Sequence, residues 1–270
     1  MGDKTKIDWC DASWNPVTGC YHECEYCYAR RIAERFNGHY IELPPRGKKK
    51  SPTIHDMIKP LRNTDTYEFM RIAGISAGRI LPYPFGFDPT FHRYKLDEPQ
   101  HWKKPRTIFV CSMADLFGEW VPDEWIKAVF DACAAAPQHR YLFLTKNPQR
   151  YIDLANKDML PREHWYGYSA TQQNQLWKFH HGGDCPCINL FVSIEPILEP
   201  VQPCFSTHTP ADWVIIGAET GNRKGKIIPR KSWIENILME CEYSGRPVFM
   251  KESLREIMGN DFRQEFPWEV

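Results

Sequence analysis

The sequence predicts an α/β fold, a partial (β/α) barrel of about six to seven parallel strands with an insertion after the first helix. Three observations predict it. Short apolar segments, rich in β-branched and aromatic residues, alternate with helix patterns from about residue 105 onward, as expected for parallel strands buried on both faces. Polar residues follow these segments where they end. With 270 residues, 42% of them hydrophobic, the chain suffices for one large domain with a substantial core.

The first elements lie near the N-terminus. "WNPVTGC" (14–20) is expected as the first strand, and a helix is expected from about Tyr28 to Phe36. Residues 38–104 then interrupt the alternation of strands and helices, because they are rich in proline, glycine and charged residues. We expect this stretch to be an inserted, lid-like segment that contacts the substrate. The prediction is therefore a single domain over 1–270 that carries one insertion.

Six further strands are expected in the rest of the chain, at 106–112, 141–145, 165–170, 189–194, 212–218 and 247–250. Two helices are expected between them. The first, 122–136, opens with Pro122 and two acids and places its apolar side chains on one side. The second, 232–245, begins with a Ser232/Glu235 capping-box pattern and ends at Gly245. A doubly wound sheet is the competing architecture, but it usually has fewer strands, and no G-x-G-x-x-G follows any strand.

Composition restricts partners and compartment. Lys plus Arg and Asp plus Glu both number 34, so the field of the whole molecule does not attract polyanions. Three basic segments, 46–50, 103–106 and 222–226, are either solvated loops or local phosphate contacts. No segment approaches the ~20 apolar residues of a membrane span, and no signal-peptide pattern is present. We therefore expect a cytoplasmic protein with no membrane partner and with mostly reduced cysteines.

Three cysteines, Cys20, Cys24 and Cys27, lie close together in "TGCYHECEYCYARR" (18–31). Zinc and iron–sulfur sites usually take four protein ligands, so the triplet is either incomplete or open at one position. For zinc, the fourth ligand would come from His22, Cys10, Cys185 or Cys187. An iron–sulfur cluster on three thiolates instead leaves one iron exchangeable, and that iron can chelate S-adenosylmethionine.

The strands of the predicted barrel end on polar residues. The carboxyl ends of barrel strands converge on one mouth, where active sites are built. The cysteine segment also follows a strand end, so we expect it at the same mouth. The strand-end residues are Ser112, Asp115, Thr145, Lys146, Ser169, Ser193, Glu195, Glu219 and Lys251.

The pattern Cys20-x3-Cys24-x-Tyr26-Cys27 resembles the signature of the radical S-adenosylmethionine (radical SAM) superfamily. "FVCSMADLF" (109–117), "VSIEPIL" (192–198), "VIIGAETG" (214–221) and "PVFMKE" (247–252) are similar to motifs of a phage and bacterial radical SAM family formerly of unknown function. The resemblance implies a partial βα barrel in which the three cysteines hold a [4Fe-4S] cluster next to S-adenosylmethionine, with the adenine near Tyr26.

The resemblance also implies roles for residues at the strand ends, although the Gly-Gly-Glu of many radical SAM enzymes is missing after the second predicted strand. Ser112 and Asp115 are candidates for the amino group of the methionine. Gly217 is a candidate for close backbone approach to the adenine. Contacts with the ribose and the carboxylate are expected from Ser169, Ser193 and Glu195. The ammonium and the carboxylate of the substrate are assigned to Glu219 and Lys251 as candidate catalytic residues.

The activity that the resemblance implies is isomerisation of a thymine that carries an amino acid, of the glycyl-thymine type, in phage DNA. A 5′-deoxyadenosyl radical would take a hydrogen from the α-carbon of that amino acid, and a carbon–nitrogen to carbon–carbon shift would follow. The reaction would contribute to base hypermodification and to evasion of host restriction, in the host cytoplasm if the protein is phage-encoded. An electron donor such as flavodoxin or ferredoxin is an expected partner.

Other functions and a second metal stay open. The same radical chemistry suits a peptide, a free nucleotide or a DNA lesion, and a non-enzymatic zinc-binding interaction module is the alternative outside enzymes. A separate question concerns Cys185, Cys187 and Cys204, which belong either to an auxiliary cluster or to a polar loop with incidental cysteines.

Overall fold

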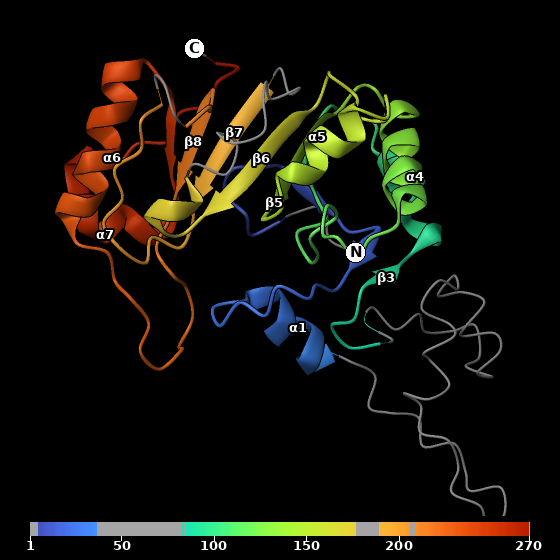
Figure 1. The fold of residues 1–270 in the computed structure, drawn as a ribbon, viewed down its shortest axis with the longest axis horizontal. Coiled ribbons are helices and arrows are strands. Elements are labelled where there is room, and N and C mark those ends of the chain that lie inside the picture. The colour runs from blue at the N-terminus through green and yellow to red at the C-terminus, as the bar shows by residue number, and fades with distance from the viewer. Residues whose placement is uncertain (1–4, 37–82, 84, 177–188, 206–208, 270) are drawn as a thin grey trace, which may run out of the picture.

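Parallel strands form one curled sheet in the computed structural model, which describes residues 5–36, 83, 85–176, 189–205 and 209–269. Within these residues the sheet has seven strands in the order β1-β4-β5-β6-β7-β8-β9, and every neighbouring pair is parallel. The strands are β1 (Ala12–Trp14), β4 (Thr107–Val110), β5 (Arg140–Thr145), β6 (Trp165–Ala170), β7 (Asn189–Ile194), β8 (Trp213–Ile216) and β9 (Val248–Met250). The curled arrangement confirms the predicted partial barrel (Figure 1).

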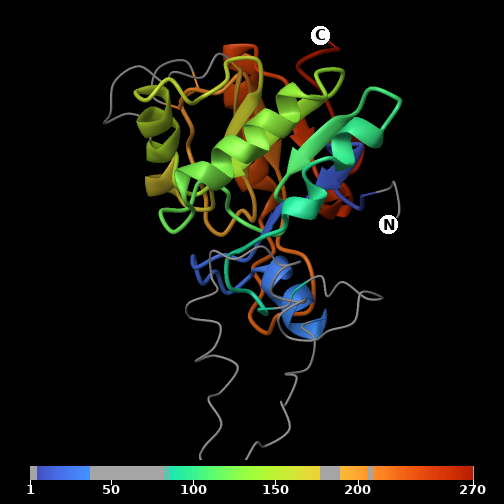
Figure 2. The same ribbon diagram turned by 90° about the vertical axis from the view of Figure 1, so that its right-hand side faces the viewer.

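Helices cover the outer face of the sheet and its carboxyl-terminal end. Figure 1 shows α4, α5 and α6 along the outer face, and Figure 2 shows α1 apart from them, beyond the end of the sheet. The helices are α1 (Tyr28–Phe36), α4 (Asp123–Ala134), α5 (Gln149–Ala155), α6 (Lys231–Ser244) and α7 (Arg255–Met258). Short 3-10 turns are η1 (Arg93–Lys95), η2 (Glu98–His101), η3 (Gln173–Gln175), η4 (Glu252–Leu254) and η5 (Gly259–Asp261). None of the described helices has the length and apolar character that a membrane crossing needs.

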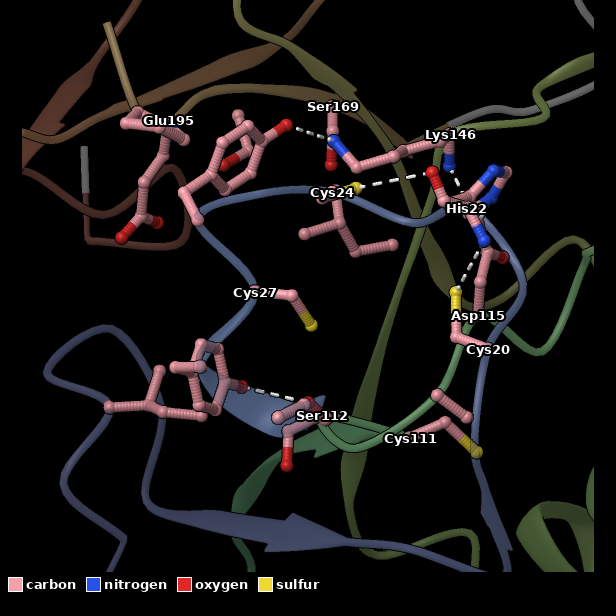
Figure 3. A pocket seen from close by; sticks show the side chains of 18 of the residues that line it. Cys20, His22, Cys24, Cys27, Cys111, Ser112, Asp115, Lys146, Ser169 and Glu195 are labelled. Atoms are coloured by element: carbon pink, nitrogen blue, oxygen red, sulfur yellow. Dashed lines mark hydrogen bonds and ion pairs between the residues drawn. The ribbon is translucent and has the colours of Figure 1, made fainter. Parts of the chain in front are cut away.

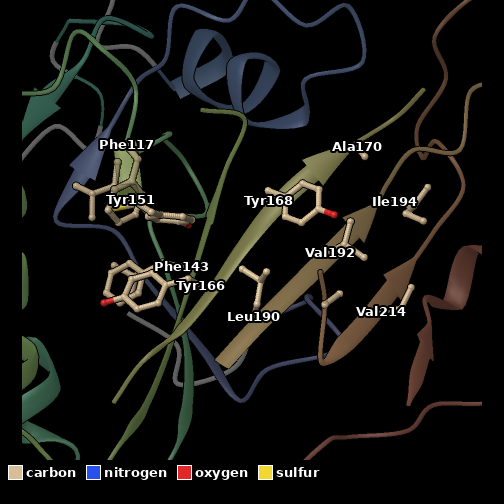
Figure 4. Close-up of a cluster of buried hydrophobic side chains, with 14 of the residues drawn as sticks. Phe117, Phe143, Tyr151, Tyr166, Tyr168, Ala170, Leu190, Val192, Ile194 and Val214 are labelled. Carbon is tan, nitrogen blue, oxygen red and sulfur yellow. The ribbon is translucent and has the colours of Figure 1, made fainter. Parts of the chain in front are cut away.

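Alternate residues of each strand face two different cores. The outer core packs the sheet against the helices and is rich in tyrosine, phenylalanine and aliphatic side chains (Figure 4). The inner core fills the concave side of the half-barrel with Trp9, Phe109, Leu142, Phe191, Trp213, Ile215 and Phe249, and Phe266 and Trp268 from the C-terminal segment pack against it. Because a strand has a period of two, the inward-facing residue after each inner-core side chain lies two positions further along. Aromatic rings therefore fill the concave side of the sheet in its middle and toward the amino ends of the strands. Beyond them, toward the carboxyl ends, the next inward-facing residues are polar.

Two local predictions differ from the structure. The expected first strand over 14–20 divides: β1 ends at Trp14, and Val17–Thr18 forms β2, which pairs antiparallel with β3 (Thr90–Phe91). Pro16 lies at this bend, where it cannot donate a ladder hydrogen bond. The capping box at Ser232 is wrong, since α6 begins at Lys231 after Arg230 without a side-chain cap. Gly245 does close α6 in the left-handed conformation, with φ of 66°.

Much of the predicted insertion, 38–104, lies outside the described residues. The basic segment 46–50 and both Cys185 and Cys187 lie outside them as well. The described end of the insertion, from Phe85 onward, returns to the domain through β3, which pairs with β2 immediately before the cysteine segment.

A buried histidine on this returning segment makes stability depend on pH. His92 is fully buried, its Nε2 lies 2.8 Å from Thr18 Oγ1, and burial lowers the pKa of its imidazole from 6.5 to about 3. Below pH 6.5 the unfolded chain binds a proton that the folded chain rejects. The free energy of unfolding should therefore fall by up to about 1.4 kcal/mol per pH unit from this one residue, until the pH nears 3.

Thermal melts between pH 7.5 and pH 5 test this expectation. His92→Gln, which does not titrate, should flatten the pH dependence, and His101→Gln, at an exposed site, should leave it unchanged. An equally steep loss of stability in His92→Gln would assign the effect to other groups.

Candidate functional site

The cysteine segment is a loop that joins β2 to α1, and the chain enters it through a sterically restricted glycine. Gly19 has φ of 90°, and a β-carbon there would lie 2.2 Å from the backbone oxygen of Asp88. The Gly19 N–H donates to Met113 O at 2.9 Å, and the Cys20 N–H donates to Phe87 O at 3.1 Å. Glycine is required here because both the left-handed backbone and the close approach exclude a side chain. The position of Cys20 is thereby fixed against two other segments.

The three thiols lie at successive points of the loop, around an open space (Figure 3). Two backbone groups of His22 contact sulfur: its N–H donates to Cys20 Sγ at 3.5 Å, and its carbonyl accepts from the Cys24 thiol at 3.9 Å. Cys27 precedes α1, and the Arg30 N–H of the first turn donates to Cys27 Sγ at 3.3 Å. The loop therefore presents three sulfurs to one space.

Burial makes one of these thiols a poor acid on its own. Loss of solvent raises the pKa of the Cys20 thiol to about 12. A cysteine ligates a metal as the thiolate, so a bound cation has to displace this proton. The thiol is therefore neutral in the metal-free chain and loses its proton when it binds a metal ion.

The open space continues into a cavity of about 220 Å³, far more than the roughly 30 Å³ of a single water molecule. The structure brings together nearly all of the site residues that the sequence predicts. Those lining this cavity are Cys20, Cys24, Tyr26, Cys27, Ser112, Asp115, Ser169, Ser193, Glu195, Glu219 and Lys251. The expected convergence of the strand ends at one mouth is thus observed.

Gly217 lies beneath an ion pair of the cavity wall. Lys251 Nζ donates to Glu195 Oε1 at 2.6 Å. A β-carbon on Gly217 would lie 3.1 Å from Lys251 Cδ and 3.2 Å from Glu195 Cγ. In this structure the glycine therefore provides room for the two charged side chains.

The strand period explains why these residues converge. Phe191, Ser193 and Glu195 are two residues apart on and after β7, so they face the concave side in succession. Phe249 and Lys251 repeat the pattern at β9. An aromatic floor thus lies below a polar layer at the carboxyl ends.

The Asp115 carboxylate is engaged in several hydrogen bonds within the domain and is therefore not free to bind a ligand. Its Oδ1 accepts from the Phe117 N–H at 3.0 Å and from Thr145 Oγ1 at 2.7 Å. Its Oδ2 accepts from the Lys146 N–H at 2.9 Å and lies 2.7 Å from His22 Nε2. Two bonds to each oxygen occupy the approximately four acceptor positions of a carboxylate. Asp115 therefore links the ends of β4 and β5 to the cysteine loop.

Glu219, another predicted residue, is held in a bidentate pair. Arg223 donates to both of its carboxylate oxygens at 2.7 Å, and this bond lowers the pKa of Glu219. Arg223 Nη1 also lies 3.4 Å from Glu25 Oε2 in the cysteine loop. The segment after β8 is thus tied to the loop that carries the thiols.

Lys146 is a functional candidate to which the sequence assigned no role. Its Nζ donates to Tyr26 Oη at 3.0 Å, and it lines the cavity. Burial alone would lower the pKa of Lys146, but Tyr26, Cys24 and Asp115 together raise it. A protonated amine therefore lies beside the thiols. The signal in the sequence was its place among the polar residues that follow the predicted strands.

One basic segment does not lie where a contact with the phosphates of a substrate at the site would require it. Segment 103–106 precedes β4, and Arg106 lines a second cavity with Arg140 and Trp165 at the amino ends of the strands. The cysteine loop lies at the opposite ends, so 103–106 does not border the candidate site. Lys224 and Lys226, in segment 222–226, are exposed on the loop that contacts Glu25.

The zinc alternative receives little geometric support from the described residues. Among them, no group of three His, Cys, Asp or Glu side chains is placed to share one metal ion. Two proposed fourth ligands are otherwise engaged: His22 contacts Asp115, and Cys10 packs against the inner core. Thiolates on a multi-iron cluster bind separate irons, so they do not need to meet at one point. The partners suggested for Cys204 lie outside the described residues.

Fold and site together define an α/β half-barrel protein with a thiol-bearing cavity at the carboxyl ends of its parallel strands. The chain belongs to the family described as "Protein of unknown function (DUF5131)", whose model matches residues 4–254. Comparisons with curated proteins and with solved structures gave no match.

Proposed function

We propose that this protein is a radical SAM enzyme that isomerises an amino-acid-modified thymine in DNA. The observation that carries the proposal is the arrangement of Cys20, Cys24 and Cys27 on one loop, around a space that opens into a polar cavity. The donor set fits a [4Fe-4S] cluster with one open iron. When bound and reduced by one electron from an external donor, the cluster together with S-adenosylmethionine would supply radical chemistry that can take a hydrogen atom from carbon.

The chain's own residues would hold and orient the bound molecules. The three cysteines would hold the cluster, and the Arg30 N–H in the first turn of α1 donates to Cys27 Sγ. Lys146 places a positive charge near the thiols and suits a carboxylate. Trp9, Phe109 and Leu144 line the bottom of the cavity with apolar surface, which keeps stray water and hydrogen donors away.

The Glu195–Lys251 pair is the best match to an amino acid among the cavity residues. Its carboxylate and ammonium, 2.6 Å apart, complement the ammonium and carboxylate of an α-amino acid. Glu219 was the earlier candidate for the ammonium, but both of its oxygens are bonded to Arg223. We therefore assign recognition of the appended amino acid to Glu195, in place of the contact with S-adenosylmethionine that the sequence suggested, and to Lys251.

DNA would have to present its base outside the duplex. A thymine that carries an amino acid is too large and too firmly paired to reach the cavity from within the helix, so we expect base flipping at a few kcal/mol. We expect Lys224 and Lys226, which are exposed on the loop after β8, to contact the flanking phosphates.

The test incubates reduced, reconstituted protein and S-adenosylmethionine with glycyl-thymine DNA, followed by digestion to nucleosides. An isomerase should give a nucleoside of unchanged mass and altered retention, and none with Cys27→Ala or with unmodified DNA. Parallel incubations contain peptides, the free nucleotide and DNA with thymine dimers. Formation of 5′-deoxyadenosine that ignores the modified DNA, or that responds to one of these other substrates, would overturn the assignment of substrate.

A further inference from the structure

His22 connects the cysteine loop to the rigid part of the domain. It lies between the first two cysteines, and its Nε2 donates to Asp115 Oδ2 at 2.7 Å. We propose that the His22–Asp115 pair is a positioning latch, which sets the places of Cys20 and Cys24 and thereby the retention of the metal group. The inference rests on the proposed function for the identity of that group.

The Asp115 carboxylate of the latch is held by several hydrogen bonds from the rest of the domain. The carboxylate is buried, and its other bonds come from Thr145 and from the backbone of Phe117 and Lys146. These donors belong to segments at the ends of two neighbouring strands of the sheet. A hydrogen bond to such a fixed acceptor restrains the imidazole far more than a bond to a mobile side chain would.

The imidazole is also held by an aromatic ring. Its centroid lies 4.9 Å from that of Trp120 in an edge-on arrangement, and the ring of Tyr21 contacts the same indole at 5.4 Å. Trp120 in turn packs so closely over Gly118 that a β-carbon there would lie 2.4 Å from the indole. The segment after β4 therefore supplies both an acceptor and a packing surface for the loop.

The backbone of His22 transmits this restraint to sulfur. Its N–H and its carbonyl contact Cys20 Sγ and Cys24 Sγ, respectively. When Cys20 is a thiolate, the N–H becomes a charge-assisted donor to it, which strengthens the contact. Fixing the ring of His22 thus fixes the peptide that lies between two metal ligands. Partners of this kind around metal ligands usually change metal affinity by about 10- to 100-fold.

The same loop contains a matched control. Glu25 lies 3.4 Å from Arg223 Nη1, but its side chain is 84% exposed, and exposed ion pairs contribute little. Glu25→Gln therefore breaks a contact of the loop without touching the latch. His22→Gln keeps a side-chain N–H donor, whereas His22→Ala removes both the donor and the ring.

The experiment has one readout without metal and one with it. In the metal-free protein, hydrogen exchange of residues 18–28 should be about tenfold faster in His22→Ala than in wild type, and unchanged in Glu25→Gln. In reconstituted protein, iron loss to a chelator should be about tenfold faster in His22→Ala, within the range expected for such partners. His22→Gln should restore most of both values. Exchange elsewhere in the domain should not change.

The outcomes separate the latch from the proposed function. If the wild type takes up no iron, the proposed function fails, and the exchange of the metal-free loop still decides whether the pair restrains it. If the wild type holds iron and His22→Ala matches Glu25→Gln in exchange and in iron loss, the latch is refuted. Faster exchange throughout the domain in His22→Ala would also refute it, because the effect would then be general destabilisation.

Discussion

Replacing any one of the three loop cysteines with alanine is expected to abolish cluster binding. Cys20, Cys24 and Cys27 lie around one space, and a cluster left with two thiolates loses a ligand that no described neighbour replaces. Iron per chain should fall by on the order of tenfold or more, and formation of 5′-deoxyadenosine should fall to background. The thermal midpoint of the metal-free variants should change little, because these side chains are only partly buried.

A cysteine outside the cavity is the control for this comparison. Cys10 packs against the inner core and was one candidate for a fourth zinc ligand. Cys10→Ala should keep its iron and its visible absorbance. Loss of metal in Cys10→Ala, with retention in one of the three loop variants, would show that the ligand set proposed here is wrong.

Gly19→Ala is expected to destabilise the domain strongly and to displace the first cysteine. The left-handed backbone at φ of 90° costs a residue with a β-carbon about 1–2 kcal/mol. The added carbon would also lie 2.2 Å from the Asp88 oxygen, and such overpacking typically costs a further ~1–3 kcal/mol. The clash is with backbone, so the chain at Cys20 has to move. Chemical denaturation measures the loss, and iron content reports the displacement.

Gly225→Ala separates the two contributions. Gly225 has φ of 79°, and a β-carbon there meets nothing within 4 Å. This variant should therefore show only the backbone penalty and should keep its iron. Equal losses of stability in Gly19→Ala and Gly225→Ala would mean that Asp88 does not restrict the start of the cysteine loop.

The course of the sheet could be predicted from the sequence because its signals are local. β7 is a short apolar run, so its burial follows from the sequence, and the inward direction of Ser193 follows by counting two residues from Phe191 once that side chain is placed in the inner core. The same counting places Glu195 and Lys251 at the mouth. The helix α5, of only seven residues, escaped prediction because it is too short to show a clear apolar face.

The partners of the site residues could not be predicted, because they depend on contacts between distant segments. Asp115 is bonded to His22, 93 positions away, and nothing in the local sequence of either residue indicates the other. Glu219 and Arg223 are four residues apart, but only the structure shows that they form an ion pair. The Glu219 carboxylate is therefore not free to bind a ligand in the cavity. The role of Gly217 beneath the Glu195–Lys251 pair is likewise a matter of tertiary packing.

The most direct test of the central claim is the metal content of the wild-type protein after anaerobic reconstitution with iron and sulfide. We predict a brown protein with about four irons per chain, which shows the paramagnetic signal of a [4Fe-4S] cluster on reduction. That signal should change when S-adenosylmethionine is added, since the open iron would then be chelated. A colourless protein that holds one zinc ion per chain and takes up no iron would contradict the account.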